Sequence, residues 1–352
     1  MPRQKFYHMA ILILIPVIFL ASFHVYAETQ NPLELRLRIE QKGDSFQVRV
    51  LLHDMELDAG PYEFNPPIDK KQIDELRWYL EDYLKWPVGP PVKRAARIEK
   101  KLHKWGKSLF DEVFADKEAY GIWLQFRTSP IDRPRVLTID STVPEILRLP
   151  WELMANEDAH LFALDITLRR RVHRGIQAVQ RQFQLPVRIL MVISRPEYTS
   201  FIDPRASAKV LLDVAEKLGK KNAEVEFLWP PTLKALNRRL RDRRKPRIHV
   251  LHFDGHGVYD MKKGLGYLLF EDENGKKDSV DAERLGNILA KSKVPLVILD
   301  ACQSAQAGRK DPFTSVAPRL IKAGVGSVVA MQYSVMVETS RRFFAAFYEG
   351  LA

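Results

Sequence analysis

Between residues 187 and 351, short apolar runs alternate with amphipathic segments of helical period, and this alternation limits the fold more than any other feature. Strand–helix alternation with short connections predicts right-handed βαβ units and a mainly parallel sheet flanked by helices, an α/β fold. The run over 294–299 is continuously apolar, as expected for a strand that is covered on both faces. Ligands of such sheets bind beyond the carboxyl ends of the strands, so we expect the chemistry there. The alternating segments are 187–193, 206–218, 223–228, 232–241, 248–253, 279–290, 294–299, 316–323, 327–331 and 339–351.

The preceding part of the chain has a different pattern, which predicts a smaller α+β region. Alternating polar and apolar residues on both sides of the Lys42-Gly43-Asp44 turn are typical of a hairpin. Two stretches of helical period follow, separated by Pro87, Pro90 and Pro91, which prevent a continuous helix. The expected elements are a hairpin over 34–52, a loop over 54–67, helices over 69–84 and 92–114, and strands over 122–126 and 135–139.

Residues 1–27 resemble a targeting segment. Arg3 and Lys5 precede an apolar stretch that ends at Val25-Tyr26-Ala27, a pattern similar to a secretory cleavage site. The stretch is also nearly long enough to span a bilayer, although a start codon assigned too far upstream would leave the same pattern. We therefore expect a signal peptide or membrane anchor over 1–27, a second region over 28–118 and the α/β domain over 120–352. The protein is then exported or membrane-anchored if 1–27 acts as a signal, and cytoplasmic otherwise.

The chain is basic, with a formal net charge of +11 and a pI near 9.5. Basic residues cluster at 169–171 and 238–247, and neither cluster alternates with the aromatic residues that form a nucleic-acid platform. We therefore expect no nucleic-acid partner, and membrane contact only through the N-terminal segment. Cys302 is the single cysteine, which excludes an intramolecular disulfide.

Two of the apolar runs end in small residues followed by a reactive side chain. The run from 248 ends at Asp254-Gly255-His256-Gly257, and the run from 294 ends at Asp300-Ala301-Cys302. A thiol needs a base because the thiolate is the nucleophile, and an imidazole can generate it and later protonate a leaving amine. If the two strands are neighbours, His256 and Cys302 emerge at one sheet edge, where the amides of Gly257 and Cys302 can form an oxyanion hole.

The same stretches resemble the CHAT domain, a bacterial caspase-like family of the caspase and separase clan, over residues 120–352. The resemblance implies a caspase-like sheet, a thiol endopeptidase that acts on a protein or peptide without a cofactor, and latency until a regulatory partner or a cleavage assembles the cleft. It also implies that His256 is the general base, Cys302 the nucleophile and Gly257 an oxyanion donor. The matching stretches are Leu149-Pro150-Trp151-Glu152-Leu153-Met154, Phe253-Asp254-Gly255-His256-Gly257, 266–272, Asp300-Ala301-Cys302-Gln303-Ser304 and 328–333.

Asp300 departs from the asparagine-like residue of many CHAT domains and is similar to the acidic residue two before the cysteine in metacaspases. It predicts a substrate pocket for Arg or Lys, and the analogy places Gln332, Tyr333 and Ser334 beside the same cleft. The family usually continues beyond the last helix, so we expect a truncated C-terminus, and no TPR-like repeat precedes the domain. Trp151 is expected to be a packing anchor, with Glu152 holding its loop to an arginine.

Two other functions stay open. A non-catalytic CHAT interaction module would keep the fold and bind protein partners. A metal-dependent hydrolase would use His249, His252, Asp254 and His256, but His249 points to the opposite strand face from His252 and Asp254, and the spacing matches no hydrolase ligand set. We therefore assign no metal ligands.

Overall fold

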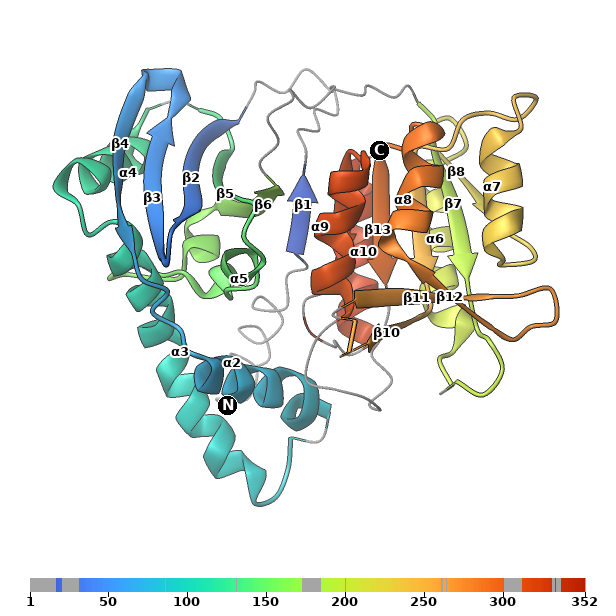
Figure 1. The fold of residues 1–352 in the computed structure, drawn as a ribbon, viewed down its shortest axis with the longest axis horizontal. Coiled ribbons are helices and arrows are strands. Elements are labelled where there is room, and N and C mark those ends of the chain that lie inside the picture. Colours follow the sequence, from blue (N-terminus) through green and yellow to red (C-terminus); the bar gives the residue numbers. More distant parts are fainter. Residues whose placement is uncertain are drawn as a thin grey trace. The chain divides into compact units, whose positions relative to one another are not determined.

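The computed structural model describes residues 17–20, 32–85, 87–130, 132–172, 185–199, 201–260, 262–263, 265–300, 312–330, 333 and 337–351. The chain forms two compact units (Figure 1). The first holds residues 27–175 and the second holds residues 176–352 together with 16–26. The family resemblance starts in the first unit and continues through the second, so each is described in turn.

The first unit is a mixed sheet of strand order β4-β3-β2-β5-β6 with helices packed on it. The central strands β2, β5 and β6 are parallel, whereas β3 and β4 extend the sheet as an antiparallel meander. The predicted hairpin is confirmed in β2 and β3. The elements are β2 (Leu33–Lys42), β3 (Ser45–Leu52), η1 (His53–Met55), β4 (Leu57–Phe64), α2 (Lys70–Arg77), η2 (Trp78–Asp82), η3 (Tyr83–Lys85), α3 (Pro91–Val113), α4 (Lys117–Thr128), β5 (Arg135–Ser141), α5 (Pro144–Leu147), η4 (Trp151–Leu153), η5 (Leu161–Leu164) and β6 (Ile166–Val172).

Two expectations for this unit were wrong. The segment expected to be a loop contains β4, since an edge strand of this sheet tolerates Pro61, which has no N–H to donate. The strand expected over 122–126 is part of α4. Asp116 caps that helix by accepting hydrogen bonds from the N–H groups of residues 118 and 119, and its buried residues recur with helical spacing at 119, 122, 123 and 126.

Residues 149–155 form a loop, here called the Trp151 loop, that contacts α3 on one side and β4, through Phe64 and Trp151, on the other. Trp151 is fully buried, and its Nε1 donates a hydrogen bond to the carbonyl oxygen of Ile146 at 2.7 Å. Arg170 on β6, also fully buried, binds both carboxylate oxygens of Glu152, with Nη2 2.8 Å from Oε2. The expectation that Glu152 holds this loop to an arginine is therefore confirmed.

Helix α3 approaches the same loop closely at Gly106, whose carbonyl oxygen accepts a hydrogen bond from the N–H of Ala155 at 3.1 Å. A Cβ atom at position 106 would overlap the carbonyl oxygen of Leu153. The absence of a side chain at Gly106 thus lets the helix backbone rest on the loop backbone.

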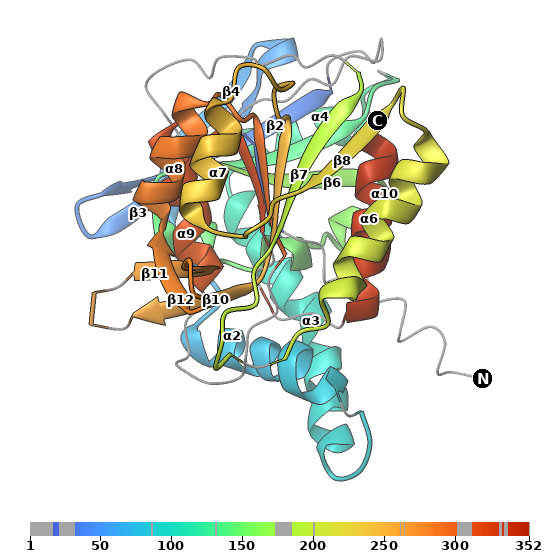
Figure 2. The same cartoon turned by 90° about the vertical axis from the view of Figure 1, so that its right-hand side faces the viewer.

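The second unit is the predicted α/β fold. Its sheet has the order β1-β14-β13-β9-β7-β8, and every pair from β14 to β8 is parallel. Helices α7, α8 and α9 cover one face, and α6 and α10 cover the other (Figure 2). The elements are β1 (Val17–Leu20), β7 (Val187–Ile193), α6 (Pro204–Leu218), β8 (Ala223–Phe227), α7 (Leu233–Arg241), β9 (Val250–Asp254), β10 (His256–Asp260), β11 (Leu265–Glu271), β12 (Lys277–Asp281), α8 (Ala282–Lys291), β13 (Leu296–Asp300), α9 (Pro312–Ala323), β14 (Ser327–Ala330) and α10 (Val337–Leu351).

The small antiparallel sheet β10-β11-β12 was not predicted. The sequence pattern indicated helix from residue 279, but the structure has strand to Asp281, which then caps α8 by accepting the N–H of Arg284 at 2.7 Å. The first strand of this small sheet, β10, follows β9 directly in the chain and begins with His256.

Most of the expected targeting segment lies outside the described residues. Its residues Val17–Leu20 form β1, which pairs antiparallel with β14. None of the helices among the described residues is both long and apolar enough to cross a membrane.

The buried ion pair under the Trp151 loop predicts a large stability effect. Replacing Arg170 with Ala leaves Glu152 and the carbonyl oxygens of Leu147 and Leu149 without their donor, and we expect a loss of about 3–5 kcal/mol in the free energy of unfolding. Urea unfolding followed by tryptophan fluorescence measures it, because five of the six tryptophans lie between residues 78 and 151.

Arg97→Ala is the matched control, since Arg97 is exposed and, among the described residues, donates to the backbone of its own helix alone. We expect that change to stay within about 0.5 kcal/mol. Equal effects of the two substitutions would contradict the anchoring role of Arg170.

Candidate active site

The two strands that precede His256 and Cys302 are neighbours in the second sheet. β9 and β13 are parallel, and their last residues, Asp254 and Asp300, face each other in the register. The Gly255 N–H then donates to the carbonyl oxygen of Asp300 at 3.2 Å, which extends the pairing one residue beyond β9. The expectation that both chains leave the sheet at one carboxyl edge is therefore confirmed for the strands.

His256 is the first residue of β10 and is 1% exposed, and Gly257 beside it is also buried. Both pair with β11, opposite Leu269 and Leu268. Gly255 makes this turn compact, because a Cβ there would lie 2.7 Å from the ring of Phe253 and 3.2 Å from the carbonyl oxygen of Ser194. His256 therefore begins the β10–β11 hairpin one residue after Gly255, immediately beyond the carboxyl end of β9.

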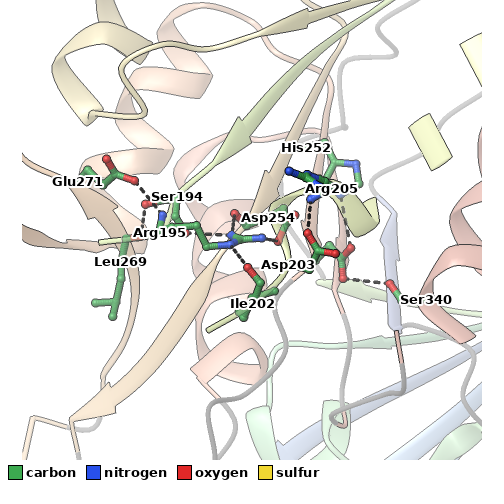
Figure 3. Close-up of polar contacts among 11 residues, drawn as sticks. Ser194, Arg195, Ile202, Asp203, Arg205, His252, Asp254, Leu269, Glu271 and Ser340 are labelled. Carbon is green, nitrogen blue, oxygen red and sulfur yellow. Dashed lines mark hydrogen bonds and ion pairs between the residues drawn. The ribbon is translucent and has the colours of Figure 1, made fainter. Parts of the chain in front are cut away.

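Arg195, two residues beyond β7, links three strand ends at this edge (Figure 3). Its Nη2 lies 2.8 Å from Asp254 Oδ1, and its Nη1 donates to the Asp254 carbonyl oxygen at 2.8 Å. Its backbone N–H donates to Glu271 at 2.8 Å, and its Nε donates to the carbonyl oxygen of Ile202 at 3.0 Å. Sequence reasoning missed Arg195, although its place just after a buried strand was the available signal.

Asp254 is buried among these groups, and burial is the main cause that raises the pKa of its carboxyl to about 6. The neighbouring Asp300 carboxylate raises it further, whereas Arg195 opposes both effects. Two carboxylates side by side in a buried layer make this edge favourable for an additional positive charge.

Asp300 faces helix α10 on the same side of the sheet. Its Oδ1 accepts a hydrogen bond from Ser340 Oγ at 3.0 Å, and its Oδ2 lies 3.9 Å from His252 Nε2. His252 Nδ1 lies 2.8 Å from the hydroxyl of Tyr348, whose pKa is raised mainly by burial. His252 is thus held between β13 and α10, and neither Ser340 nor Tyr348 was identified from the sequence.

A family model for the CHAT domain matches residues 107–352. The chain belongs to the CHAT domain family. A comparison with curated proteins found no significant match. The match includes the Trp151 loop, both strand ends and the hairpin that holds His256, so the expected membership is confirmed.

Within this CHAT domain the predicted site residues separate into two groups. His256, Gly257 and Asp300 come together at the carboxyl edge of β9 and β13, and Tyr333 is buried shortly after β14, the next strand in the sheet. Cys302, Gln332 and Ser334 lie outside the described residues. Their roles remain predictions.

The four residues considered as metal ligands do not converge. His249 lies before the first residue of β9, at the other end of the strand from Asp254, and it accepts a hydrogen bond from the Arg188 N–H at 3.2 Å. Burial lowers the pKa of His249 to about 4, with a further contribution from Arg188. In the described part of the chain, no three His, Cys, Asp or Glu side chains are placed to hold a metal ion.

The raised pKa of Asp254 predicts a pH dependence of stability. Because the folded pKa of about 6 exceeds the ordinary 3.8, the folded state binds this proton more tightly than the unfolded chain. The resulting stabilisation is fully present below about pH 4 and is lost as the pH rises through about 6. Asp254→Asn should therefore gain stability relative to the wild type between those values, by up to about 3 kcal/mol.

Chemical denaturation at a series of pH values measures this difference. Asp213→Asn, at an exposed position of α6, is the control for losing a surface carboxyl. A difference between Asp254→Asn and the wild type that stays constant with pH would contradict a raised Asp254 pKa.

Proposed function

We propose that this CHAT domain is a cysteine endopeptidase that uses His256 as general base and Cys302 as nucleophile. The observation that supports it most is the register of β9 and β13. His256 follows Asp254 by two residues, Cys302 follows Asp300 by two residues, and Asp254 and Asp300 are paired. Since neighbouring strands are about 4.8 Å apart, base and thiol leave the sheet within reach of each other.

In the proposed reaction, the imidazole of His256 takes the proton from the Cys302 thiol, and the thiolate attacks the carbonyl carbon of the scissile peptide bond. The amides of Gly257 and Cys302 stabilise the oxyanion that forms. The tetrahedral intermediate collapses to a thioester as the C–N bond breaks, and the imidazolium gives its proton to the leaving amine. A water molecule, deprotonated by His256, then attacks the thioester and releases the acid and the free thiol.

The proposed peptidase is latent in this conformation. His256 is 1% exposed and Gly257 is buried, so a substrate carbonyl cannot reach the Gly257 amide without movement of the hairpin β10–β11. Binding of a protein partner or a cleavage in the chain would supply that movement.

Asp300 is the proposed specificity residue for Arg or Lys before the scissile bond, with Gln332, Tyr333 and Ser334 bordering the same cleft. The carboxylate is buried and holds Ser340, so a substrate cation would have to displace that hydroxyl. The exchange is reasonable because a guanidinium can make two charge-assisted hydrogen bonds to the carboxylate, whereas the Ser340 hydroxyl makes one. Asp254 lies beside Asp300 in the register, but Arg195 offsets its charge, so Asp300 is the carboxylate proposed to bind the substrate cation.

A second candidate function is a non-catalytic CHAT module that binds protein partners. The burial of His256 favours it, because a base that never becomes accessible has only a structural role. The two candidates differ in whether Cys302 reacts as an activated thiol.

A peptide chloromethyl ketone ending in arginine tests the dyad. Because the proposed latent conformation must open before the probe can enter, we expect slow alkylation of the purified chain at Cys302, with the adduct located by mass spectrometry after a long incubation. His256→Ala should slow the labelling by at least about 100-fold, because general-base assistance is typically worth that much or more.

His53→Ala removes an exposed histidine of the first unit and should leave the labelling rate unchanged. Labelling that is indifferent to His256 would show that the dyad is not assembled. Complete absence of labelling would favour the non-catalytic module.

The specificity pocket is tested separately by comparing probes. The wild type should react at least about tenfold faster with the arginine probe than with the matching leucine probe, and Asp300→Asn should abolish this preference. A faster reaction with a probe ending in aspartate would contradict the role proposed for Asp300.

A further inference from the structure

A hollow of about 1060 Å³ opens at the edge of the second sheet opposite the candidate active site. It lies where α7 and α8, which share one face of the sheet (Figure 2), both end, and it is completed by the segments that lead into β9 and β13. These are the amino ends of the two strands whose carboxyl ends precede His256 and Cys302. A molecule in this hollow would therefore leave the candidate active site open.

The lining of the hollow is strongly basic. Seven of its fifteen residues are Arg or Lys, and Asp242 is its single acidic residue. Six of these cations are exposed, and we call the site they form the basic hollow: Arg241, Arg243, Lys245, Arg247, Lys291 and Lys293.

Ion pairs with acidic residues of the protein neutralise only part of this positive charge. Glu226 holds the buried Arg239 at 2.7 Å and lies 3.5 Å from Lys245, and Asp242 pairs with Arg244 at 3.1 Å. The other five exposed cations make no ion pair with any residue that the structure describes. The carboxyl ends of α7 and α8 supply a partial negative charge of about 0.5 each, which offsets about one of the five.

The shape and the lining of the basic hollow indicate the class of its partner. A bilayer surface is flat and would not enter a concave site. The fifteen lining residues include no aromatic side chain on which a nucleic-acid base could stack. They do include Asn237, Asn287 and Ser292, which can donate and accept hydrogen bonds as a peptide backbone requires.

We propose that the basic hollow binds an acidic segment, rich in Asp and Glu, of a partner protein. Guanidinium groups pair with carboxylates through two parallel hydrogen bonds, and three of the five unpaired cations are arginines. This site is independent of the peptidase proposal, since it uses none of the residues at the carboxyl edge of the sheet.

A labelled oligoglutamate peptide tests the proposal by fluorescence anisotropy with the full chain. In about 0.1 M salt, where the Debye length is about 10 Å, we expect saturable binding. The combined substitution Arg243→Glu, Arg247→Glu and Lys293→Glu should weaken it by at least about tenfold. The neutral pair Arg243→Gln and Arg247→Gln should weaken it in the same direction.

The control reverses the same number of charges elsewhere on the second unit, at the exposed Lys262, Lys276 and Lys277. It should leave the peptide affinity within about twofold, because those lysines lie outside the hollow. Equal weakening by both triple variants, or no binding by the wild type, would overturn the proposal. Tighter binding of a DNA duplex or of phosphatidylglycerol vesicles than of the peptide, sensitive to the hollow variant, would also overturn it.

Discussion

The candidate site depends on the in-register pairing of β9 with β13. Because Asp254 and Asp300 are opposite each other, the chains beyond them leave one sheet edge together, and the Gly255 N–H keeps them together for one more residue. A shift of this register by one residue would move one chain's side chains to the other face of the sheet. The relative position of the two strand ends, Asp254 and Asp300, is therefore set by backbone hydrogen bonds between buried strands.

Charge is arranged differently at the two edges of the same sheet. At the carboxyl edge, the buried Asp254 pairs with Arg195, and the buried Asp300 lies 3.9 Å from His252, so the charged groups there are shielded from water. At the amino edge, exposed guanidinium and ammonium groups surround a concave site. If both proposals hold, a cationic group binds at one end of this sheet and an anionic group at the other, without competition between them.

Much of the second unit could be predicted because its strands are buried on both faces, and continuous apolar runs report that burial directly. The sequence left open whether β9 and β13 are neighbours, and the common edge of their ends depended on that condition, which the structure meets. The errors arose where local pattern is ambiguous: the short apolar run 122–126 fits a strand or one face of a helix, and Pro61 in β4 is tolerated only because that strand is at an edge. The contacts of Arg195, Ser340 and Tyr348 join segments far apart in the chain, and no local pattern reports such contacts.

The close approach of α3 to the Trp151 loop at Gly106 restricts which substitutions this part of the sequence can accept. In a helix interior, glycine is less favourable than alanine by about 1 kcal/mol, so most such positions would improve on mutation. Here the Cβ atom of any other residue would collide with the backbone of Leu153. No change of side-chain rotamer can relieve this collision, because the Cβ position is fixed by the backbone. The position is closed to substitution unless the Trp151 loop changes at the same time, and the helix and the loop can diverge only as a coevolving pair.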